Sequence, residues 1–599
     1  MTDLPAQAFR ELAETHLAAV QKRLPNGTLE RFVLFVEVVR AMDYWGIHGS
    51  LAGESQEGAG ESLDLMYWGW NRAVAELFEP LEQRGAFPLM ESTQGSRALA
   101  VGLMQEFGKV SLLQRLADMS EKGIAELTRD GDEFHVRTGA DVRALFADAT
   151  ELDRLKAAEV HLPSSNAGWE MTSTRNAERF PGMPGNYMAL ANTPAKRWLR
   201  SDIEELIKPL VRPWDTGRGV MVAYDARSEV DQHYMAEALA LATSWREASG
   251  IHPNAKLGTI TGADVAGVSA ALICLHSKHF ACVSVAKKHF SQVSVPQSLT
   301  IWGPRTALEE SISIVSGRAL PVVHAAFNAL AMTSEQAKKL ANHSMPLIPL
   351  LFDLGNGFIL RPVSCLTRNP FTAVKTQHQW LDSRTEHAVA ADREDWMRSH
   401  LYAMFSGRRY SCFPGNLKLR HAGTTLTDID AIVYDRLTGD VGLFQLKWQD
   451  YSTNDIRQLR SKAANLAAEL FDWSGKVRSW IQEYGVSALD KSLRLKKKRR
   501  ETVRNVFLFA ISKAAVRTQG YGVVVDAPDL AMAVWPQFAR ARMEIGPSDR
   551  TLRDIHTQLL AEYGQVPKIT PIPTSLDVAG TKVHIHNLWN RIDQPEVMA

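Results

Sequence analysis

The residues best suited to chemistry lie in the segment TLTDIDAIVYDRLTGDVGLFQLKWQD. Asp430 can supply a carboxylate oxygen and Gln445 an amide oxygen, which are the hard ligands that Mg²⁺ prefers. The main-chain carbonyl of Leu446 offers a third oxygen. Lys447 could orient a water or stabilise negative charge in a transition state. Because a bound Mg²⁺ or Mn²⁺ ion can polarise a phosphate and lower the pKa of water, the group suits phosphodiester hydrolysis.

These residues are expected to lie on a β-hairpin. Two apolar runs, IDAIVYD and VGLFQLKW, flank RLTGD, a pattern typical of an antiparallel pair of strands. Side chains alternate along a strand, so one face of the second strand should pack into a core: Phe444, Leu446 and Trp448. Gln445 and Lys447 share the other face, and Asp430 lies on the first strand on the face of Asp428 and Ile432. The hairpin can therefore present a carboxylate, an amide and an ammonium together.

This arrangement resembles the PD-(D/E)xK nuclease superfamily, in which an acidic residue precedes a short hairpin that carries (D/E/Q)xK. The glutamine form followed by an aromatic residue is most similar to Mrr-type restriction endonucleases, where QxK replaces ExK. The resemblance implies that Asp430 is the metal-binding acid, Gln445 the second ligand and Lys447 the catalytic lysine. It covers the C-terminal region only.

Members of the superfamily often add a glutamate from the preceding helix, and REDWMRSHLYAMF offers Glu394 as a further catalytic and metal-binding candidate. Its spacing from Met397, Leu401 and Phe405 places it on the inward, apolar stripe of a helix. A metal site would explain an inward acid; the alternative is a carboxylate favoured by the dipole at the start of a helix. Glu386 is a weaker alternative.

The elements around the hairpin agree with the αβββαβ core of the superfamily. DIRQLRSKAANLAAELFDW has the spacing of an amphipathic helix, VRNVFLFAIS reads as a buried strand, and RRYSCF offers an initial strand. Gln458 matches a polar position often found near the site in Mrr-like proteins.

A basic run, KSLRLKKKRR at 491–500, follows this helix. It could contact DNA phosphates, which would make binding salt-dependent; the alternative is a solvated loop. Two arginines of the helix could extend the same surface. The candidate DNA-binding residues are Lys496, Lys497, Lys498, Arg499, Arg500, Arg457 and Arg460.

The 599 residues suggest roughly three to five domains. We expect an α/β multidomain protein: a mainly helical domain at 1–210, a mixed α/β domain at 211–375, the nuclease-like domain with its restriction-endonuclease-like core at 376–520, and a C-terminal α/β extension at 521–599. The large N-terminal part could recognise substrate, bind partner proteins or self-associate.

The composition of the chain limits how it could bind nucleic acid and in which cell compartment we expect it. The net charge is +1, so nucleic-acid binding would depend on local basic patches. Four cysteines are too few for a disulfide framework and fit a reducing cytoplasm. No apolar run reaches about 18 residues, so we expect no membrane span.

Two other groups could bind metal. Cys274, His276, His279 and Cys282 form CxHxxHxxC, but on one helix they would point to more than one face, which favours buried cysteines and ordinary histidines. His584 and His586, in KVHIHNLW, have no evident acidic or cysteine partner nearby and are expected to be structural or surface residues.

The sequence thus predicts a cytoplasmic, Mg²⁺- or Mn²⁺-dependent DNA endonuclease, with restriction or antiviral defence as a role by analogy. Because the neutral Gln445 should bind metal less strongly than a glutamate, an alternative is a catalytically silent nuclease fold that binds nucleic acid or acts as a scaffold. RNA is the alternative substrate.

Overall fold

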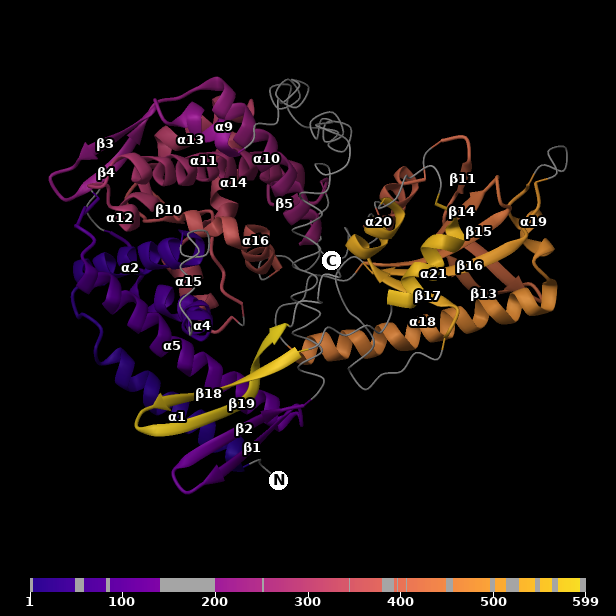
Figure 1. Ribbon diagram of the computed structural model, residues 1–599, viewed down its shortest axis with the longest axis horizontal. Helices are drawn as coiled ribbons and strands as arrows, with labels where there is room; N and C mark the ends of the chain where they lie inside the picture. Colours follow the sequence, from indigo (N-terminus) through magenta and orange to yellow (C-terminus); the bar gives the residue numbers. More distant parts are fainter. Residues whose placement is uncertain are drawn as a thin grey trace.

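The structure is a computed structural model, and its ribbon has a larger and a smaller lobe (Figure 1). The structure describes residues 4–48, 59–81, 87–139, 200–249, 251, 253–343, 345–379, 393–395, 397–405, 407–448, 456–495, 501–512, 527–543, 550–562 and 569–592.

The large lobe contains most of the first 379 residues. Its helices are α1 (Leu4–Gln21), α2 (Thr28–Asp43), η1 (Tyr44–His48), α4 (Ala59–Leu77), α5 (Gln94–Glu121), α9 (Arg200–Ile207), α10 (Ser228–Ala248), α11 (Gly262–His289), α12 (Val295–Leu299), α13 (Arg305–Ser316), α14 (Leu320–Leu330), α15 (Ser334–Leu340), η3 (Val363–Thr367) and α16 (Pro370–Gln379). Its short strands are β1 (Ala125–Asp130), β2 (Glu133–Thr138), β3 (Val211–Asp215), β4 (Val220–Tyr224), β5 (Lys256–Leu257), β6 (Ile260–Thr261), β7 (Ile301–Pro304), β8 (Ala331–Met332), β9 (Leu351–Asp353) and β10 (Phe358–Arg361).

One hydrophobic core joins the two segments that the sequence separates at residue 210. It contains buried side chains from Val20 in α1 to Val374 in α16, with the stacked rings of Phe35 and Phe78 among them. Among the described residues, the first segment is mainly helical and the second is mixed α/β, as expected, but the two share this core. Periodicity identifies the buried face of a helix without showing which element covers it.

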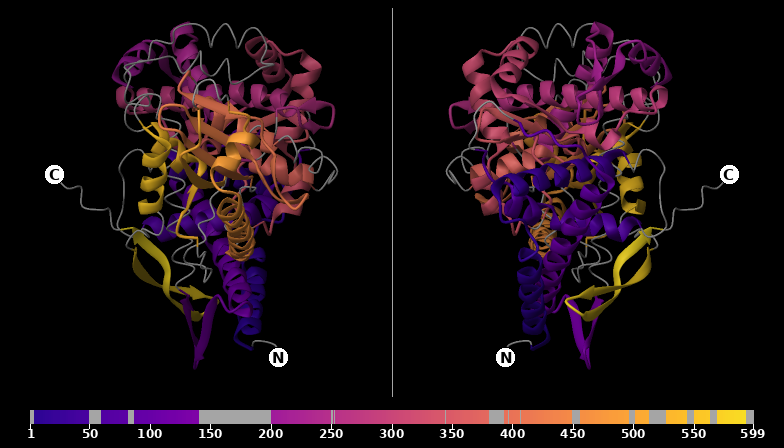
Figure 2. Two further views of the ribbon diagram at one scale, coloured as in Figure 1. Left: turned by 90° about the vertical axis from the view of Figure 1, so that its right-hand side faces the viewer. Right: turned by 90° about the vertical axis from the view of Figure 1, so that its left-hand side faces the viewer.

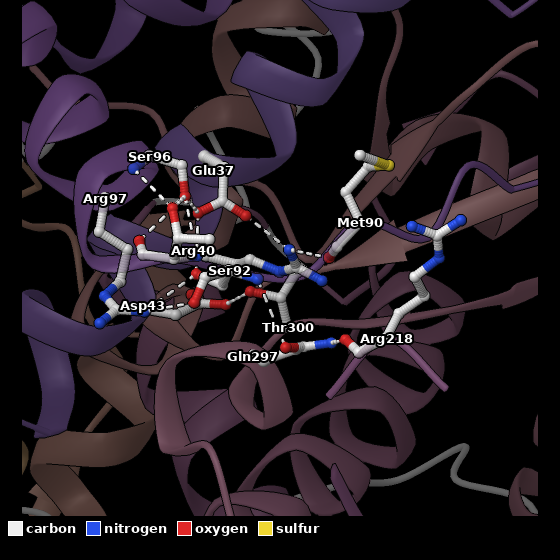
Figure 3. A network of polar contacts seen from close by, with 11 residues as sticks. Glu37, Arg40, Asp43, Met90, Ser92, Ser96, Arg97, Arg218, Gln297 and Thr300 are labelled. Atoms are coloured by element: carbon white, nitrogen blue, oxygen red, sulfur yellow. Dashed lines mark hydrogen bonds and ion pairs between the residues drawn. The ribbon is translucent and has the colours of Figure 1, made fainter. Parts of the chain in front are cut away.

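A buried polar network crosses the same boundary (Figure 3). In α2, Glu37 pairs with Arg40 at 2.5 Å and accepts a hydrogen bond from the Ser92 hydroxyl at 2.8 Å. One turn later, Asp43 accepts a hydrogen bond from the hydroxyl of Thr300, just after α12, at 2.6 Å. All five side chains are buried, so these contacts fix α2 against the segment that follows residue 210.

Helix α11 runs through the large lobe. Among the described helices, it is the one long and apolar enough by composition to cross a membrane, and 72% of its apolar window is buried inside the fold. The core helix of a globular protein has the same composition. Thr261 and Asp264 form a capping box at its N-terminus.

The end of the described chain returns to the large lobe (Figures 1 and 2). Strands β18 (Ile569–Val578) and β19 (Thr581–Ile592) form a hairpin, and β19 pairs in parallel with β2, giving the strand order β1-β2-β19-β18. Phe9 of α1, Val136 and Ile585 are buried in one cluster behind this sheet. The predicted extension at 521–599 is therefore divided, because its first half belongs to the other lobe.

The small lobe is built on a five-stranded mixed sheet. Its strands are β11 (Tyr410–Phe413), β14 (Ala431–Asp435), β15 (Asp440–Lys447), β16 (Asn505–Ser512) and β17 (Leu530–Val534), and this is also their order in the sheet. The pairs β11–β14 and β14–β15 are antiparallel, whereas the pairs β15–β16 and β16–β17 are parallel. The predicted hairpin is present as β14 and β15. The expected order of elements is interrupted, because two further strands lie between β11 and β14 in the chain.

Helices cover both faces of this sheet. On one face, α18 (Ile456–Tyr484) buries Leu466, Leu470 and Trp473 against Leu443. The opposite face carries the helical residues 397–403, α20 (Trp535–Met543) and α21 (Leu552–Glu562). Phe444 and Leu446 are buried on that second face, as strand alternation predicts.

A second hairpin was not predicted. Strands β12 (Leu417–His421) and β13 (Thr424–Ile429) pair outside the main sheet and pack on α18, which is followed by the short α19 (Ser487–Ser492). The indole N–H of Trp473 donates to the Asp428 carbonyl at 2.9 Å, and that of Trp480 donates to the Arg420 carbonyl at 3.0 Å. These contacts hold the chain just before Asp430.

Candidate functional site

Asp430 lies at a bend between β13 and β14. Its main-chain N–H donates to the Phe444 carbonyl at 3.1 Å, and its Oδ2 accepts from the main-chain N–H of Leu446 at 2.7 Å. The Asp430 carboxylate thus accepts the Leu446 N–H that a main-chain carbonyl would accept if the β14–β15 ladder continued. This contact sets it beside the segment from Gln445 to Lys447, so the structure brings three of the predicted residues together.

The environment of Asp430 opposes its negative charge. The residue is 5% exposed, and burial raises the pKa of its carboxyl from 3.8 to about 7. The Leu446 N–H and the Lys447 ammonium lower this pKa, whereas the nearby carboxylates of Glu394 and Asp428 raise it. A cation bound here would favour the ionised form.

Gln445 points an unsatisfied acceptor into the protein. The residue is 8% exposed, and its Oε1 has no hydrogen-bond partner among the described residues. A buried acceptor without a partner costs about 1–3 kcal/mol. An oxygen of this kind, adjacent in the ladder to a buried carboxylate, fits a Mg²⁺ ligand.

Lys447 is held by a residue that the sequence did not single out. Its Nζ lies 2.7 Å from Oε2 of Glu469 in α18. Glu469 precedes the buried Leu470 by one position and follows the buried Leu466 by three, so it lies at the edge of the apolar stripe of α18. This position at the edge of the stripe is the sequence feature that could have identified Glu469 as a partner for Lys447.

Glu394 lies near Asp430 but does not point into the core. Its side chain is 40% exposed and pairs with Arg398 one turn later at 2.8 Å, whereas Met397 and Leu401 on the predicted stripe are buried. The side chain of Glu394 is therefore not buried on the apolar stripe as predicted, because it is half exposed and pairs with Arg398. Its charge still reaches Asp430, whose pKa it raises.

Arg398 was also missed, although its spacing from Glu394 is that of a helical ion pair. Its Nε donates to the Asp430 carbonyl, and an Nη donates to Oδ1 of Asn416 at 3.2 Å. A Cβ on Gly415 would overlap both that Nε and the Asp430 carbonyl. Glycine is therefore required where Arg398 fastens the helix to the bend.

The oxygen atoms available at this site suit a hard metal ion that keeps some of its water ligands. In the described part of the chain, no three histidine, cysteine, aspartate or glutamate side chains group closely enough to hold a metal. The available donors are the Asp430 carboxylate, the Gln445 amide oxygen and the Leu446 carbonyl. Glu394 could join them if it exchanged its partner Arg398 for the ion. Mg²⁺ commonly keeps several waters in such sites.

The side chains of the predicted DNA-binding residues all lie outside the part of the chain that the structure describes. Residues 496–500 lie outside the described residues. Arg457, Gln458 and Arg460 belong to the first turns of α18, and their side chains are also outside the description.

The other metal-binding candidates are engaged by the protein. The CxHxxHxxC motif lies in α11; His276 contacts the Leu272 carbonyl at 2.6 Å, and His279 contacts the Ser298 carbonyl at 2.6 Å. On β19, His584 contacts Glu133 of β2 at 3.0 Å. That acidic partner was not evident from the sequence, because β2 is distant along the chain.

Comparison with known proteins adds no relative: no protein-family model, no curated protein and no solved structure matches the chain.

Proposed function

We propose that the small lobe is a metal-dependent nuclease of the PD-(D/E)xK type that hydrolyses phosphodiester bonds of DNA. The observation that carries the proposal is the pair of buried acceptors: Asp430, whose carboxylate has no salt bridge within the described residues, and Gln445, whose amide oxygen has no hydrogen-bond partner there. A divalent cation would satisfy both. Lys447, next along the strand, supplies the positive charge that phosphoryl chemistry needs.

The roles of the residues follow from their chemistry. Asp430 and Gln445 would hold Mg²⁺ or Mn²⁺, with the Leu446 carbonyl and, after rearrangement, Glu394. When bound, the ion supplies a Lewis acid for the phosphate and lowers the pKa of a coordinated water. The Lys447 ammonium would donate hydrogen bonds to the attacking water or to a non-bridging phosphate oxygen.

The test is cleavage of plasmid and linear DNA by the full chain with Mg²⁺, Mn²⁺ or a chelator. We expect Asp430→Ala and Lys447→Ala to abolish metal-dependent cleavage. Lys476→Ala is a matched control, because Lys476 is an exposed partner of Asp472 elsewhere on α18. Cleavage that persists in both site variants would rule out this site.

A second candidate is a silent nuclease fold that binds nucleic acid or acts as a scaffold. The pairing of Glu394 with Arg398 favours it, because a protein cation already engages a carboxylate that would otherwise complete the metal site. Isothermal titration with Mg²⁺ and Mn²⁺ separates the two functions. No binding to the wild type, and none after Gln445→Glu, would favour the silent fold.

The substrate and setting are part of the same proposal. Side-by-side digestion of DNA and RNA tests the preference for DNA. If the 496–500 segment contacts phosphates, affinity for uncleaved DNA in chelator should fall steeply with salt. Recognition of substrate or partner proteins, or self-association, would fall to the large lobe, in a cytoplasmic role in restriction or antiviral defence.

A further inference from the structure

We propose that Glu469 of α18 is a positioning residue that holds the Lys447 ammonium in place for the reaction. The inference rests on the proposed nuclease function and extends the site from the hairpin to the helix that follows it. Its basis is the 2.7 Å contact between Lys447 Nζ and Glu469 Oε2.

The position of Lys447 makes such a partner necessary. Its side chain is 30% exposed and lies at the last residue of β15, so the ladder that fixes its main chain leaves its long side chain free to rotate. Lysine has a long side chain with many rotamers, and an unrestrained ammonium would spend much of its time in solvent. A carboxylate on the neighbouring helix selects the rotamer that stays over the sheet.

The charges around Lys447 agree with this role. Lys447 directly follows Leu446, whose main-chain N–H donates to the Asp430 carboxylate at 2.7 Å, and its ammonium touches Glu469. Lys447 is thus next in the chain to the residue that binds the acid at the bend, and it is in direct contact with an acid of α18. An ammonium has three donors; one engages Glu469 and the others remain for a water and a phosphate oxygen.

Structural stability does not account for the pair. Glu469 is 57% exposed, and ion pairs at such exposure contribute little to the free energy of unfolding. The backbone of α18 is placed independently by buried Leu466, Leu470 and Trp473. Removing the charge of Glu469 should thus leave the helix where it is and change only Lys447.

The experiment compares Glu469→Gln and Glu469→Asp with wild type in the full chain. Asp472→Asn is the control, because Asp472 is a similarly exposed acid on α18 that pairs with Lys476 at 2.6 Å. With saturating Mg²⁺, we expect Glu469→Gln to lower the single-turnover rate about tenfold or more, since misplacement of a group at the reacting centre costs at least this much. KM, DNA affinity in chelator and Tm (to within about 2 °C) should stay as in wild type. Glu469→Asp should recover part of the rate.

A readout without metal checks the contact itself. Mass spectrometry of the protein after brief amine labelling in chelator should show several-fold faster modification of Lys447 in Glu469→Gln, because the ammonium is no longer engaged. Labelling of Lys476 should not change in this variant.

The outcomes are distinct. If the wild type cleaves and Glu469→Gln behaves like Asp472→Asn, or cleaves faster, or shows only a raised KM, the positioning role is wrong and the nuclease proposal stands. Unchanged labelling of Lys447 would also overturn the role. If the wild type cleaves with neither metal, both proposals fall.

Discussion

Replacing Asp430 with asparagine should stabilise the small lobe at pH 8 while abolishing the proposed activity. The native side chain is 5% exposed, and burial raises the pKa of its carboxyl to about 7. Asparagine keeps an oxygen that can accept the Leu446 N–H and carries no charge to desolvate. The variant therefore removes a cost that the native residue imposes on folding.

The magnitude follows from linkage between proton binding and folding. A rise from 3.8 to about 7 is roughly three pKa units, and each unit corresponds to about 1.4 kcal/mol, giving on the order of 4 kcal/mol. The folded chain binds this proton more tightly than the unfolded chain. The protonated Asp430 carboxyl therefore makes its full contribution to the stability of the folded state below about pH 4. This contribution declines as the pH rises and is lost above about pH 7.

Hydrogen exchange in β14 and β15, followed by mass spectrometry on the full chain, reports the free energy of opening this sheet without requiring two-state unfolding of both lobes. The advantage of Asp430→Asn over wild type should be near zero at pH 4 and largest at pH 8. Asp472→Asn, which removes an exposed carboxylate of α18 that pairs with Lys476, is the control. The reasoning is refuted if the advantage does not change with pH, or if Asp430→Asn opens more readily than wild type at pH 8.

Three further outcomes follow from the same contacts. Metal affinity should rise with pH up to about pH 7, by at most tenfold per pH unit, because the Asp430 carboxyl must lose its proton to bind an ion. Titration calorimetry between pH 5.5 and 8 measures this dependence. An affinity that does not change with pH would count against Asp430 as a ligand. Gly415→Ala should destabilise the small lobe by about 1–3 kcal/mol, because the new Cβ overlaps Arg398 and the Asp430 carbonyl. Hydrogen exchange in β14 measures this loss of stability. An unchanged exchange rate would show that Arg398 moves freely. Glu37→Gln should cost the large lobe about 3–5 kcal/mol by leaving Arg40 buried without its partner, which calorimetry would register as a lower Tm, whereas an unchanged Tm would mean that solvent reaches Arg40.

Local pattern was sufficient to predict the hairpin. The alternation that separates Phe444 and Leu446 from Gln445 and Lys447 depends only on strand geometry, and the buried cluster on one face of β15 confirms it. The helix and the strand that follow the hairpin could be predicted for the same reason, since each element carries its own periodicity.

Contacts between distant elements could not be predicted in this way. Glu469 reaches Lys447 only because α18 packs across the sheet, and Arg398 reaches the Asp430 carbonyl only because the chain bends there. The β12–β13 hairpin contains short polar strands whose apolar side is covered by α18. Likewise, β19 lies beside β2 through a parallel pairing that no local signal indicates.

The ion pairs of the site identify where a cation would bind. Glu394 pairs with Arg398, which also pairs with Asp395, and Lys447 pairs with Glu469, so each of these charges already has a partner. Within the described residues, the Asp430 carboxylate has only main-chain and longer-range electrostatic compensation, and the Gln445 Oε1 has no hydrogen-bond partner. Both acceptors are buried, where an unbalanced negative charge is costly. A divalent ion at this point would balance the buried Asp430 carboxylate without breaking either existing pair, so metal binding does not require Glu394 to move first.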